Sequence, residues 1–424
     1  MNIPTAYFST QPTTSKKAEN NRKLEDIIQT LNHSSSSDQW AIAGETFRQS
    51  FNRASSEDRT QLLLNLANTF AVDHSALENA ISIYQRNSTA SAEVRRAATP
   101  LYHLLFQATG NRFGGVKCIC DVREHLLEAL ESGSDPVLRR IEETAKELLT
   151  MWFCLSNLTL ERLTWQSPAD ILHKVAKYEA VHPVAGITDL QRRVGASRRC
   201  FLFTHEAMPR EPLVVVHVAL TRTVADNLQA ILKSDEEDGV EDDEATTAIY
   251  YSISSTQKGL AGIDLGNLLI KGVVEELERE LPRVKTHSTL SPIPGFRAWV
   301  LRSLKGNSEF EETTRLLLQS LSSTRLQPEN LISLKDMLLH LAAVYLLRAK
   351  RNGFALNPVA NFHIRNGAEV YRLNWAADSS PRGMDRSFGI MVNYRYDIEE
   401  VHSNSESYTS RKCIATHAQV AQLL

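Results

Sequence analysis

The chain has 424 residues, of which 42% are hydrophobic, 23% charged and 7% aromatic. This composition excludes disordered, collagen-like and coiled-coil proteins, and the length fits two domains or three small ones. The 47 basic and 50 acidic side chains give a formal net charge of -3, so the excess of positive charge typical of proteins that bind nucleic acid or membrane surfaces is missing. We therefore expect small molecules or copies of the same chain as partners.

The few, scattered cysteines indicate a reducing compartment. The apolar segments predict buried helices and no membrane span. Five scattered cysteines do not make a disulfide framework, and no group of His, Cys, Asp and Glu has metal-ligand spacing. The apolar run Met337 to Leu347 is interrupted by His340 and is shorter than the roughly 18 residues of a membrane span, so it predicts a buried helix. The first twenty residues lack the apolar core of a secretory signal. We expect a cytoplasmic protein that does not contact membranes.

The first part of the chain is predicted to be helical. Apolar residues recur at helical spacing from Leu24 to about Leu155, and the strongest break is Gly110 to Gly115. Ser55, with an acidic residue three positions later, is a candidate helix cap, and Pro100 should end or kink another helix. We predict an all-helical domain over residues 1–155.

The second part, residues 156–424, changes to short β-branched and aromatic runs separated by helical stretches. The first four runs are Cys200 to Thr204, Leu213 to Thr221, Thr246 to Ser254 and Val284 to Leu290. Two acidic blocks, Asp235 to Asp238 and Glu241 to Glu244, lie between the second and third runs. They are predicted to be a solvated loop, because like charges repel one another.

The last third is predicted to contain a helix, a hairpin and a further strand. The expected elements are a helix from Pro328 to about Arg351 closed by Asn352-Gly353, strands Ala360 to Arg365 and Ala368 to Trp375 joined by Asn366-Gly367, and strand Phe388 to Tyr396. Together with the earlier runs they predict an α/β (α+β) domain with a mixed sheet.

A glycine-containing turn precedes a predicted helix from Asp264 to about Leu281. Gly259 and Gly262 lie in this turn, and glycines before a helix allow backbone N–H groups to point at an anion such as pyrophosphate. The spacing matches neither the dinucleotide fingerprint nor the P-loop. A phosphate site and an ordinary turn therefore both remain open.

Two further positions, Ser291 and His363, have side chains suited to catalysis. Ser291 precedes two prolines that make its turn rigid, although a serine before proline is also a common turn residue. His363 lies in a predicted strand, on the same face as Asn361, and a half-buried imidazole transfers protons near neutral pH; a hydrogen-bonded structural histidine is the alternative. Tyr394 and Tyr396 also share a strand face, as core aromatics do.

Several motifs resemble the malonyl-CoA decarboxylase family over about residues 140 to 410. They are Tyr251-Ser-Ile-Ser254, Gly262-Ile-Asp-Leu-Gly266, Ser288-Thr-Leu-Ser-Pro-Ile-Pro-Gly-Phe296, Asn357-Pro-Val-Ala-Asn-Phe-His363 and Asn393-Tyr-Arg-Tyr396. The resemblance implies a helical domain that self-associates, with a tetramer expected, and a catalytic domain of the acetyl-CoA-dependent N-acetyltransferase fold. It also implies conversion of malonyl-CoA to acetyl-CoA and carbon dioxide without metal or organic cofactor.

The same resemblance assigns candidate site residues. The acyl-CoA-binding stretch falls on Ala261, Gly262, Ile263, Asp264, Leu265, Gly266 and Asn267, with Ser291, and the catalytic residues fall on Ser291, His363, Asp264 and Tyr396. The general acetyltransferase pattern would have Gln or Arg near Ala261 and Gly near Asp264. Asp264 instead matches a carboxylate position of the decarboxylases.

The chemistry of decarboxylation gives these residues hypothetical roles. Loss of carbon dioxide from a malonyl thioester leaves an enolate, which needs charge stabilisation and then a proton on carbon. Ser291 would engage the malonyl carboxylate or its proton, His363 would deliver the proton, Asp264 would orient a partner and Tyr396 would donate a hydroxyl hydrogen bond. Two alternatives stay open: an acyl-CoA-dependent acyltransferase, since fold alone does not fix a reaction, and a helical scaffold with an acyl-CoA-sensing domain.

Overall fold

The computed structural model describes residues 36–233, 240–304 and 327–424. The chain forms two compact units. The helical unit contains the residues up to Thr159 together with Thr204–Leu213 and Gln257–Asp264, and the sheet unit contains the remainder. The acidic block Asp235 to Asp238 lies outside the described residues.

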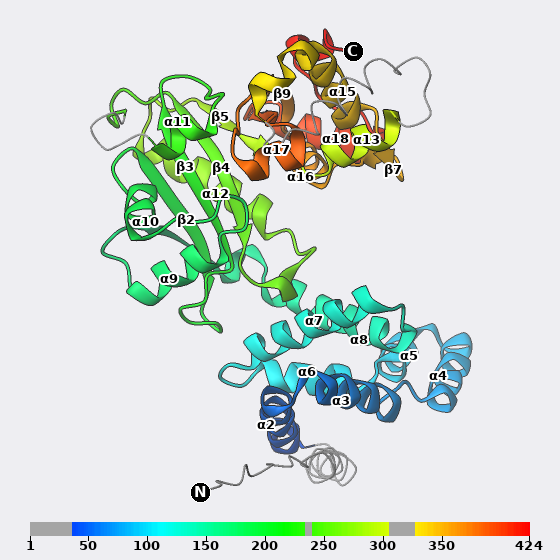
Figure 1. The fold of residues 1–424 in the computed structure, drawn as a ribbon. Coiled ribbons are helices and arrows are strands. Elements are labelled where there is room, and N and C mark those ends of the chain that lie inside the picture. The colour runs from blue at the N-terminus through cyan, green and yellow to red at the C-terminus, as the bar shows by residue number, and fades with distance from the viewer. Residues whose placement is uncertain (1–35, 234–239, 305–326) are drawn as a thin grey trace, which may run out of the picture. The chain divides into compact units, whose positions relative to one another are not determined.

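The helical unit contains the blue-to-cyan helices of Figure 1. They are α2 (Ser37–Arg53), α3 (Ser56–Thr69), α4 (His74–Arg86), α5 (Ser91–Ala98), α6 (Leu101–Gly110), α7 (Gly115–Ser132) and α8 (Pro136–Trp152). The Ser55 hydroxyl accepts a hydrogen bond from the Asp58 backbone N–H at 3.2 Å and caps α3, as predicted. Pro100 separates α5 from α6, and the break from Gly110 to Gly115 separates α6 from α7. The helical prediction is confirmed for the described residues of this part, 36–155; residues 1–35 lie outside them.

The segment Gln257–Asp264 packs on α7 of the helical unit. A Cβ atom on Gly259 would lie 2.0 Å from the Cys120 carbonyl oxygen, so only glycine fits there. Arg123 Nη1 donates to the Gly259 carbonyl at 2.6 Å, and Arg123 Nε donates to a buried Glu142 carboxylate at 2.9 Å. The start of the predicted phosphate-binding turn is therefore held in place by residues of α7.

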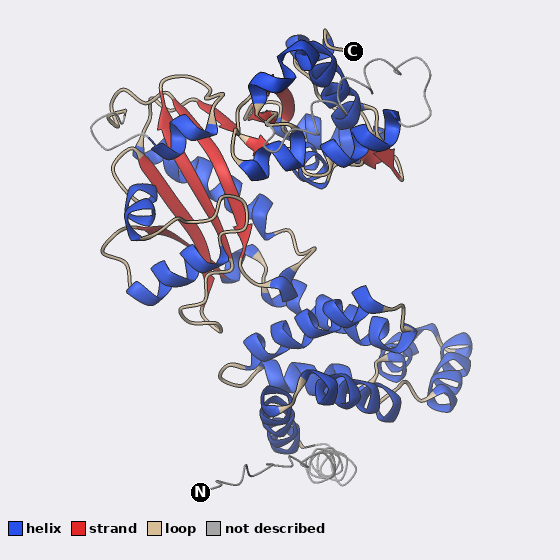
Figure 2. Ribbon diagram, in the orientation of Figure 1, coloured by secondary structure: helices blue, strands red, loops and turns tan. Residues whose placement is uncertain are grey.

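A mixed sheet forms the centre of the sheet unit (Figure 2). Its strands are β1 (Leu158–Leu163), β2 (Arg198–His205), β3 (Val214–Thr221), β4 (Thr247–Ser255), β5 (Thr286–Thr289), β6 (Ser291–Pro292), β9 (Glu369–Asn374) and β10 (Met391–Tyr396). They run in the order β1-β2-β3-β4-β5-β10-β6, and β9 pairs with β10. β4 and β5 are parallel, whereas β2–β3, β3–β4, β5–β10, β6–β10 and β9–β10 are antiparallel.

The parallel pair at the centre of the sheet is short. β4 pairs with β5 from Thr247↔Thr286 to Tyr250↔Thr289, whereas β4 stays paired with β3 as far as Ser255. The two central strands therefore separate beyond Tyr250.

The remaining helices cover the sheet or extend from it. They are α9 (Ala169–Tyr178), α10 (Ile187–Arg193), α11 (Leu228–Lys233), α12 (Leu265–Glu280), α13 (Phe296–Leu304), α15 (Lys335–Leu347, preceded by the 3₁₀ segment Pro328–Leu334), α16 (Pro358–Arg365), α17 (Pro381–Ser387), α18 (Val401–Arg411) and α19 (Ala418–Ala421).

Alternating residues of β10 point to opposite faces of the sheet. Val392 and Tyr394 belong to the same hydrophobic cluster as Ile270 of α12 and Ile364 of α16, whereas Met391 belongs to a separate cluster with Leu228 of α11. The sheet thus separates an α12–α16 side from an α11 side.

The region around His363 differs from the prediction. Residues 358–365 form helix α16 rather than a strand, because Pro358 occupies the first helical turn and the Asn357 side chain caps it, accepting from Ala360 N at 2.8 Å. Asn366-Gly367 ends this helix, with Gly367 at φ +86°. The predicted hairpin with a turn at Asn366-Gly367 is therefore wrong.

The other Asn-Gly pair forms the hairpin instead. Asn352 and Gly353, both with positive φ, connect β7 (Lys350–Arg351) to β8 (Phe354–Ala355), as a primed two-residue turn requires. The preceding helix ends at Leu347 rather than Arg351.

The stretch Pro328–Leu347 is long and apolar enough to cross a membrane by length and composition alone. Leu338, Ala342 and Leu346 are nevertheless fully buried in the hydrophobic cluster of the sheet unit. We assign this stretch to the core of the fold.

Candidate active site

Ser291 lies where the sheet continues from β5 into β6. Its backbone pairs with Val392 of β10, so its side chain lies on the α12–α16 side. The Ser291 hydroxyl donates to Thr289 Oγ1 at 2.9 Å. Thr289 Oγ1 also accepts the Tyr394 backbone N–H at 3.1 Å, so the hydroxyl partner of Ser291 is itself fixed by the sheet.

His363 is held opposite Ser291 by the capping residue of its helix. Asn357 Nδ2 donates to the Pro294 carbonyl at 2.8 Å, and Pro294 belongs to the rigid turn that follows Ser291. The same residue therefore starts α16 and attaches it to the turn of Ser291. As a result, His363 Nε2 lies 3.3 Å from Ser291 Oγ.

Aromatic residues of β10 surround the other side of the imidazole. Tyr396 Oη lies 2.8 Å from His363 Nδ1, and the Tyr394 ring stacks on the imidazole with centroids 4.6 Å apart. Tyr394 and Tyr396 share a face of the strand, as predicted. Burial lowers the pKa of His363 to about 3, so the imidazole is neutral at physiological pH.

A neutral imidazole has one N–H and one lone pair, so two hydrogen-bond arrangements fit this geometry. While the Ser291 hydroxyl donates to Thr289, Tyr396 donates to Nδ1 and Nε2–H donates to Ser291 Oγ. In the other arrangement Nδ1–H donates to Tyr396, and the Ser291 hydroxyl turns away from Thr289 to donate to Nε2. Exchange between them moves a proton along the line Tyr396–His363–Ser291. The arrangement can therefore pass a proton to a group bound beside Ser291.

The start of α12 approaches α16 within the sheet unit. A Cβ atom on Gly266, in the first turn of α12, would lie 2.9 Å from the Phe362 ring. The Phe362 and His363 rings are 5.0 Å apart between centroids. Leu265, Gly266 and Asn267, the last part of the predicted acyl-CoA-binding stretch, thus lie in a turn packed beside the helix of His363.

The first part of that stretch, Ala261 to Asp264, belongs to the helical unit. Gly262 adopts φ +75°, and a Cβ atom at this position would lie 3.8 Å from Lys146 Nζ of α8. The structure thus places a lysine ammonium group near the glycine turn. Asp264 is the last residue before α12, and its role in orienting a partner stays a prediction.

The structure brings together three of the four predicted catalytic side chains, those of Ser291, His363 and Tyr396. Sequence reasoning did not identify Thr289 and Asn357. Thr289 lies two positions before Ser291, the spacing of residues on one strand face, and Asn357 before a proline is a helix-start signal. Assigning a strand to residues 360–365 concealed the second signal. Among the described residues, no group of three His, Cys, Asp or Glu side chains is placed to hold a metal ion.

Two family models match the chain. The model described as the malonyl-CoA decarboxylase N-terminal domain matches residues 70–153, and the model of the C-terminal domain matches residues 156–424. The chain is also similar to the proteins named "Malonyl-CoA decarboxylase, mitochondrial" of Anser anser anser and Mus musculus. The identities are 42% over 397 residues and 41% over 406 residues, covering 85% and 88% of this chain and 79% and 82% of theirs.

The chain is also similar to solved structures of malonyl-CoA decarboxylases. The crystal structure of malonyl-CoA decarboxylase from Rhodopseudomonas palustris matches with a TM-score of 0.86 at 35% identity, covering 97% of this chain and 100% of that one. The enzyme from Agrobacterium vitis matches with a TM-score of 0.86 at 33% identity, covering 96% and 99%.

Acid should destabilise the protein through buried His363. Its pKa is lowered to about 3 by burial, whereas an unfolded histidine titrates near 6.5. Between these values only the unfolded chain binds the proton, so the free energy of unfolding falls as pH decreases from about 6.5. In His363→Gln the loss of stability between pH 7 and pH 5, measured by urea denaturation, should be smaller by about 2 kcal/mol. A matched substitution at exposed His402 is the control, and an undiminished loss in His363→Gln would contradict a neutral buried imidazole.

Proposed function

The chain belongs to the malonyl-CoA decarboxylase family, and on this premise we propose that Ser291, His363 and Tyr396 perform the proton transfer of its reaction. The protein is a carboxy-lyase that converts malonyl-CoA to acetyl-CoA and carbon dioxide, as the resemblance predicted. This reaction replaces the acyltransferase and scaffold alternatives. The contact of 3.3 Å between Ser291 and His363 is the observation on which the proposed mechanism rests.

Ser291 engages the malonyl carboxylate in this mechanism. The bond between the α-carbon and the carboxylate breaks, its electron pair moves into the thioester carbonyl as an enolate, and carbon dioxide leaves. The thioester is a sufficient electron sink for this step. Thr289 Oγ1 holds the Ser291 oxygen in place and is itself bound to the Tyr394 backbone, so the hydroxyl has only to turn its proton from Thr289 to the carboxylate when substrate arrives.

His363 then supplies the proton to the α-carbon. A substrate carboxylate bound nearby raises the pKa of the imidazole, because an opposite charge favours the protonated form. The proton passes from Nε2 to the α-carbon of the enolate, directly or through the Ser291 hydroxyl, and solvent restores it. Tyr396 fixes the ring through Nδ1, and we assign to Asp264 the orientation of a partner group. No metal or organic cofactor takes part in these steps.

The acyl-CoA chain is proposed to lie where β4 and β5 separate. Pairing ends at Tyr250↔Thr289 while β4 continues to Ser255, and an extended chain with amide groups can add to such an opening by backbone-type hydrogen bonds. The parallel central pair, followed from β4 by a glycine turn and α12, supports assigning the acetyl-CoA-dependent N-acetyltransferase fold to the sheet unit. The pyrophosphate would bind at residues 261–267, where backbone N–H groups begin a helix.

Lys146 is proposed to add a positive charge to this phosphate site. The Lys146 ammonium group lies near the Gly262 turn, and a cation beside backbone N–H groups strengthens binding of a phosphate.

Replacing His363 with Asn should lower kcat by about 10² to 10⁴ while changing acetyl-CoA affinity little, because general acid catalysis is lost but the CoA contacts remain. Asparagine preserves a hydrogen-bonding atom near the position of Nδ1 but removes Nε2. Release of carbon dioxide and the dissociation constant of acetyl-CoA measure the two effects, and His402→Asn is the matched control. Near-normal turnover in His363→Asn would remove this residue from the mechanism.

Replacing Lys146 with Ala should raise the KM for malonyl-CoA about two- to fivefold and leave kcat nearly unchanged, because an exposed charge contributes modestly to binding. Arg140→Ala removes another exposed cation of α8 and should leave both constants unaltered. Equal effects of the two substitutions would argue against a phosphate contact at Lys146.

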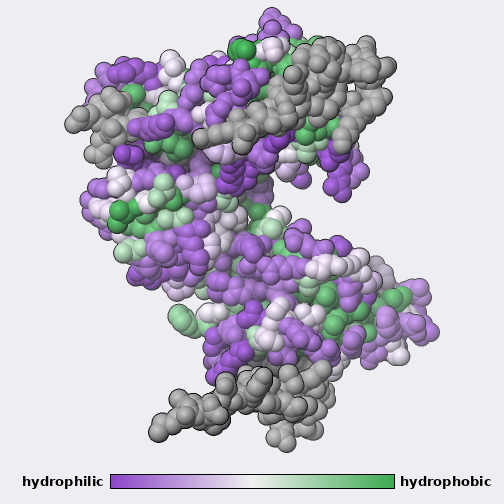
Figure 3. Space-filling view, viewed as in Figure 1, coloured by the Kyte–Doolittle hydropathy of each residue, from purple (hydrophilic) through white to green (hydrophobic). Residues whose placement is uncertain are grey.

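Self-association through the helical unit is proposed, with a tetramer as the expected assembly. Helix α4 buries only Ala80, and Ile81, Ile83 and Tyr84 are each about 40% exposed. Figure 3 shows hydrophobic residues on the surface of this unit. Apolar side chains left at the surface of a helix favour a second copy as a partner.

Ile81→Asp should therefore shift the protein toward smaller assemblies, since a buried carboxylate without a partner destabilises an interface. Light scattering coupled to size-exclusion chromatography measures the mass, with Gln85→Asp as the control on the same helix. An unchanged mass for Ile81→Asp would exclude this face of α4 as an interface.

The cytoplasmic location predicted from the sequence stays a proposal. The relatives of Anser anser anser and Mus musculus have the word mitochondrial in their names. Cell fractionation measures the compartment of this chain, and recovery in the cytosolic fraction is the expected result.

A further inference from the structure

A pocket of about 370 Å³ lies within the sheet unit, on the α11 side of the sheet. Pro292 and Met391 line it, and these residues pair with each other across β6 and β10. Their chain neighbours Ser291 and Val392 point to the opposite face, where His363 lies. The pocket and the proposed catalytic group are therefore on opposite sides of the same strand pair.

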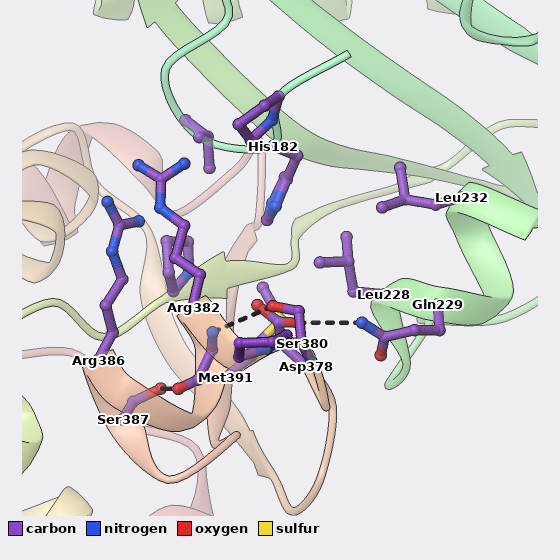
Figure 4. Close-up of a pocket in the computed structure, with 15 residues that line it drawn as sticks. His182, Leu228, Gln229, Leu232, Asp378, Ser380, Arg382, Arg386, Ser387 and Met391 are labelled. Atoms are coloured by element: carbon purple, nitrogen blue, oxygen red, sulfur yellow. Dashed lines mark hydrogen bonds between the residues drawn. The ribbon is translucent and has the colours of Figure 1, made fainter. Parts of the chain in front are cut away.

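Helix α17 gives the pocket its positive charge (Figure 4). The side chains of Arg382 and Arg386 extend from the helix in the same direction. Arg382 Nη2 donates to the Ala180 carbonyl at 2.8 Å, whereas Arg386 has no hydrogen bond or ion pair within the described parts of the chain. Burial and, after it, the positive charge of Arg382 lower the pKa of Arg386. A bound anion would relieve both effects.

Asp378 is the one carboxylate among the described residues that line the pocket, and it is already engaged. Asp378 Oδ1 accepts hydrogen bonds from Gln229 Nε2 at 2.9 Å and from the Ser380 backbone N–H at 3.0 Å. Two guanidinium groups and one carboxylate give the described lining residues a net charge of +1. A ligand with a single negative charge matches this balance, whereas a dianion would exceed it.

His182 adds an unused hydrogen-bond acceptor. Its side chain is only 8% exposed and lines the pocket, and Nε2 is buried with no partner among the residues described. Burial lowers the pKa of His182 to about 4, and the imidazole also bonds to the Tyr251 backbone. The Tyr251 carbonyl can only accept a hydrogen bond, so Nδ1 of His182 carries the proton and donates to it. Nε2 of the neutral ring then has a lone pair that can accept a hydrogen bond.

The loop of His182 is rigid. The Glu179 carboxylate accepts the backbone N–H groups of Val181 and His182 at 2.8 and 2.9 Å and the Ser252 hydroxyl at 2.8 Å. An unsatisfied buried nitrogen held this firmly has a cost in free energy unless a ligand satisfies it.

We propose that this pocket binds a small hydroxycarboxylate, with its carboxylate against Arg382 and Arg386 and its hydroxyl donating to His182 Nε2. A guanidinium group matches a carboxylate in a planar, bidentate geometry. Leu228, Leu232 and Met391 provide an apolar wall for the carbon chain. The volume lies near the lower limit for small-molecule sites, about 300 to 1,000 Å³. This site is independent of the proposed decarboxylation mechanism.

Calorimetric titration of the full chain with 3-hydroxybutyrate, butyrate and inorganic phosphate tests the proposal. The hydroxycarboxylate should bind more tightly than butyrate and phosphate. Arg386→Gln should weaken its binding at least about tenfold, the loss expected for a charge-assisted hydrogen bond. Arg411→Gln, at an exposed arginine of α18, should bind it like the unaltered protein.

His182→Asn separates the hydroxyl contact from the charge contact. Asparagine can keep a donor near the Tyr251 carbonyl but lacks Nε2, so this variant should bind 3-hydroxybutyrate and butyrate equally. No binding by the unaltered protein, preference for phosphate, or unchanged affinity in Arg386→Gln would overturn the proposal. A large rise in the KM for malonyl-CoA in Arg386→Gln would also overturn it, because the pocket would then be part of the substrate site.

Discussion

The attachment of α16 to the turn after β6 is the constraint on which the proposed site depends. Asn357 caps the helix through its side-chain oxygen and donates its amide to the Pro294 carbonyl, so two segments more than sixty residues apart are fixed by one side chain. The imidazole of His363 is then placed 3.3 Å from Ser291. A helix of only eight residues is not stable by itself in water, so α16 depends on this attachment.

Burial determines what the imidazole can do. His363 is enclosed by the stacked Tyr394 ring, by Tyr396 and by Ser291, and this environment favours the neutral form. In the proposed mechanism this neutral histidine would become protonated beside a bound carboxylate, which would link proton uptake to substrate binding. The same environment is expected to lower the stability of the protein in acid and, in the proposed mechanism, to prepare the imidazole for proton transfer.

The two Asn-Gly pairs show where local sequence signals reach their limit. Both Asn352-Gly353 and Asn366-Gly367 permit a hairpin turn and a helix end. At Gly367 a Cβ atom would lie 2.0 Å from the Val401 carbonyl oxygen, whereas at Gly353 it would meet only the Lys412 side chain at 3.4 Å. The role of each pair depends on what lies beside it in the folded chain, and a residue pair viewed in isolation does not contain that information.

The amino-acid sequence by itself determined the helical first part, the mixed sheet of the second part and the family, because hydrophobic periodicity and the motifs from Tyr251 to Tyr396 are properties of the linear chain. It also identified Ser291, His363 and Tyr396 as candidates. Only the tertiary structure decided that His363 lies on a helix and that Thr289 and Asn357 hold the group together. It also revealed the pocket of Arg386 and His182 on the other side of the sheet. These features arise from contacts between residues distant in sequence, which neither spacing nor propensity encodes.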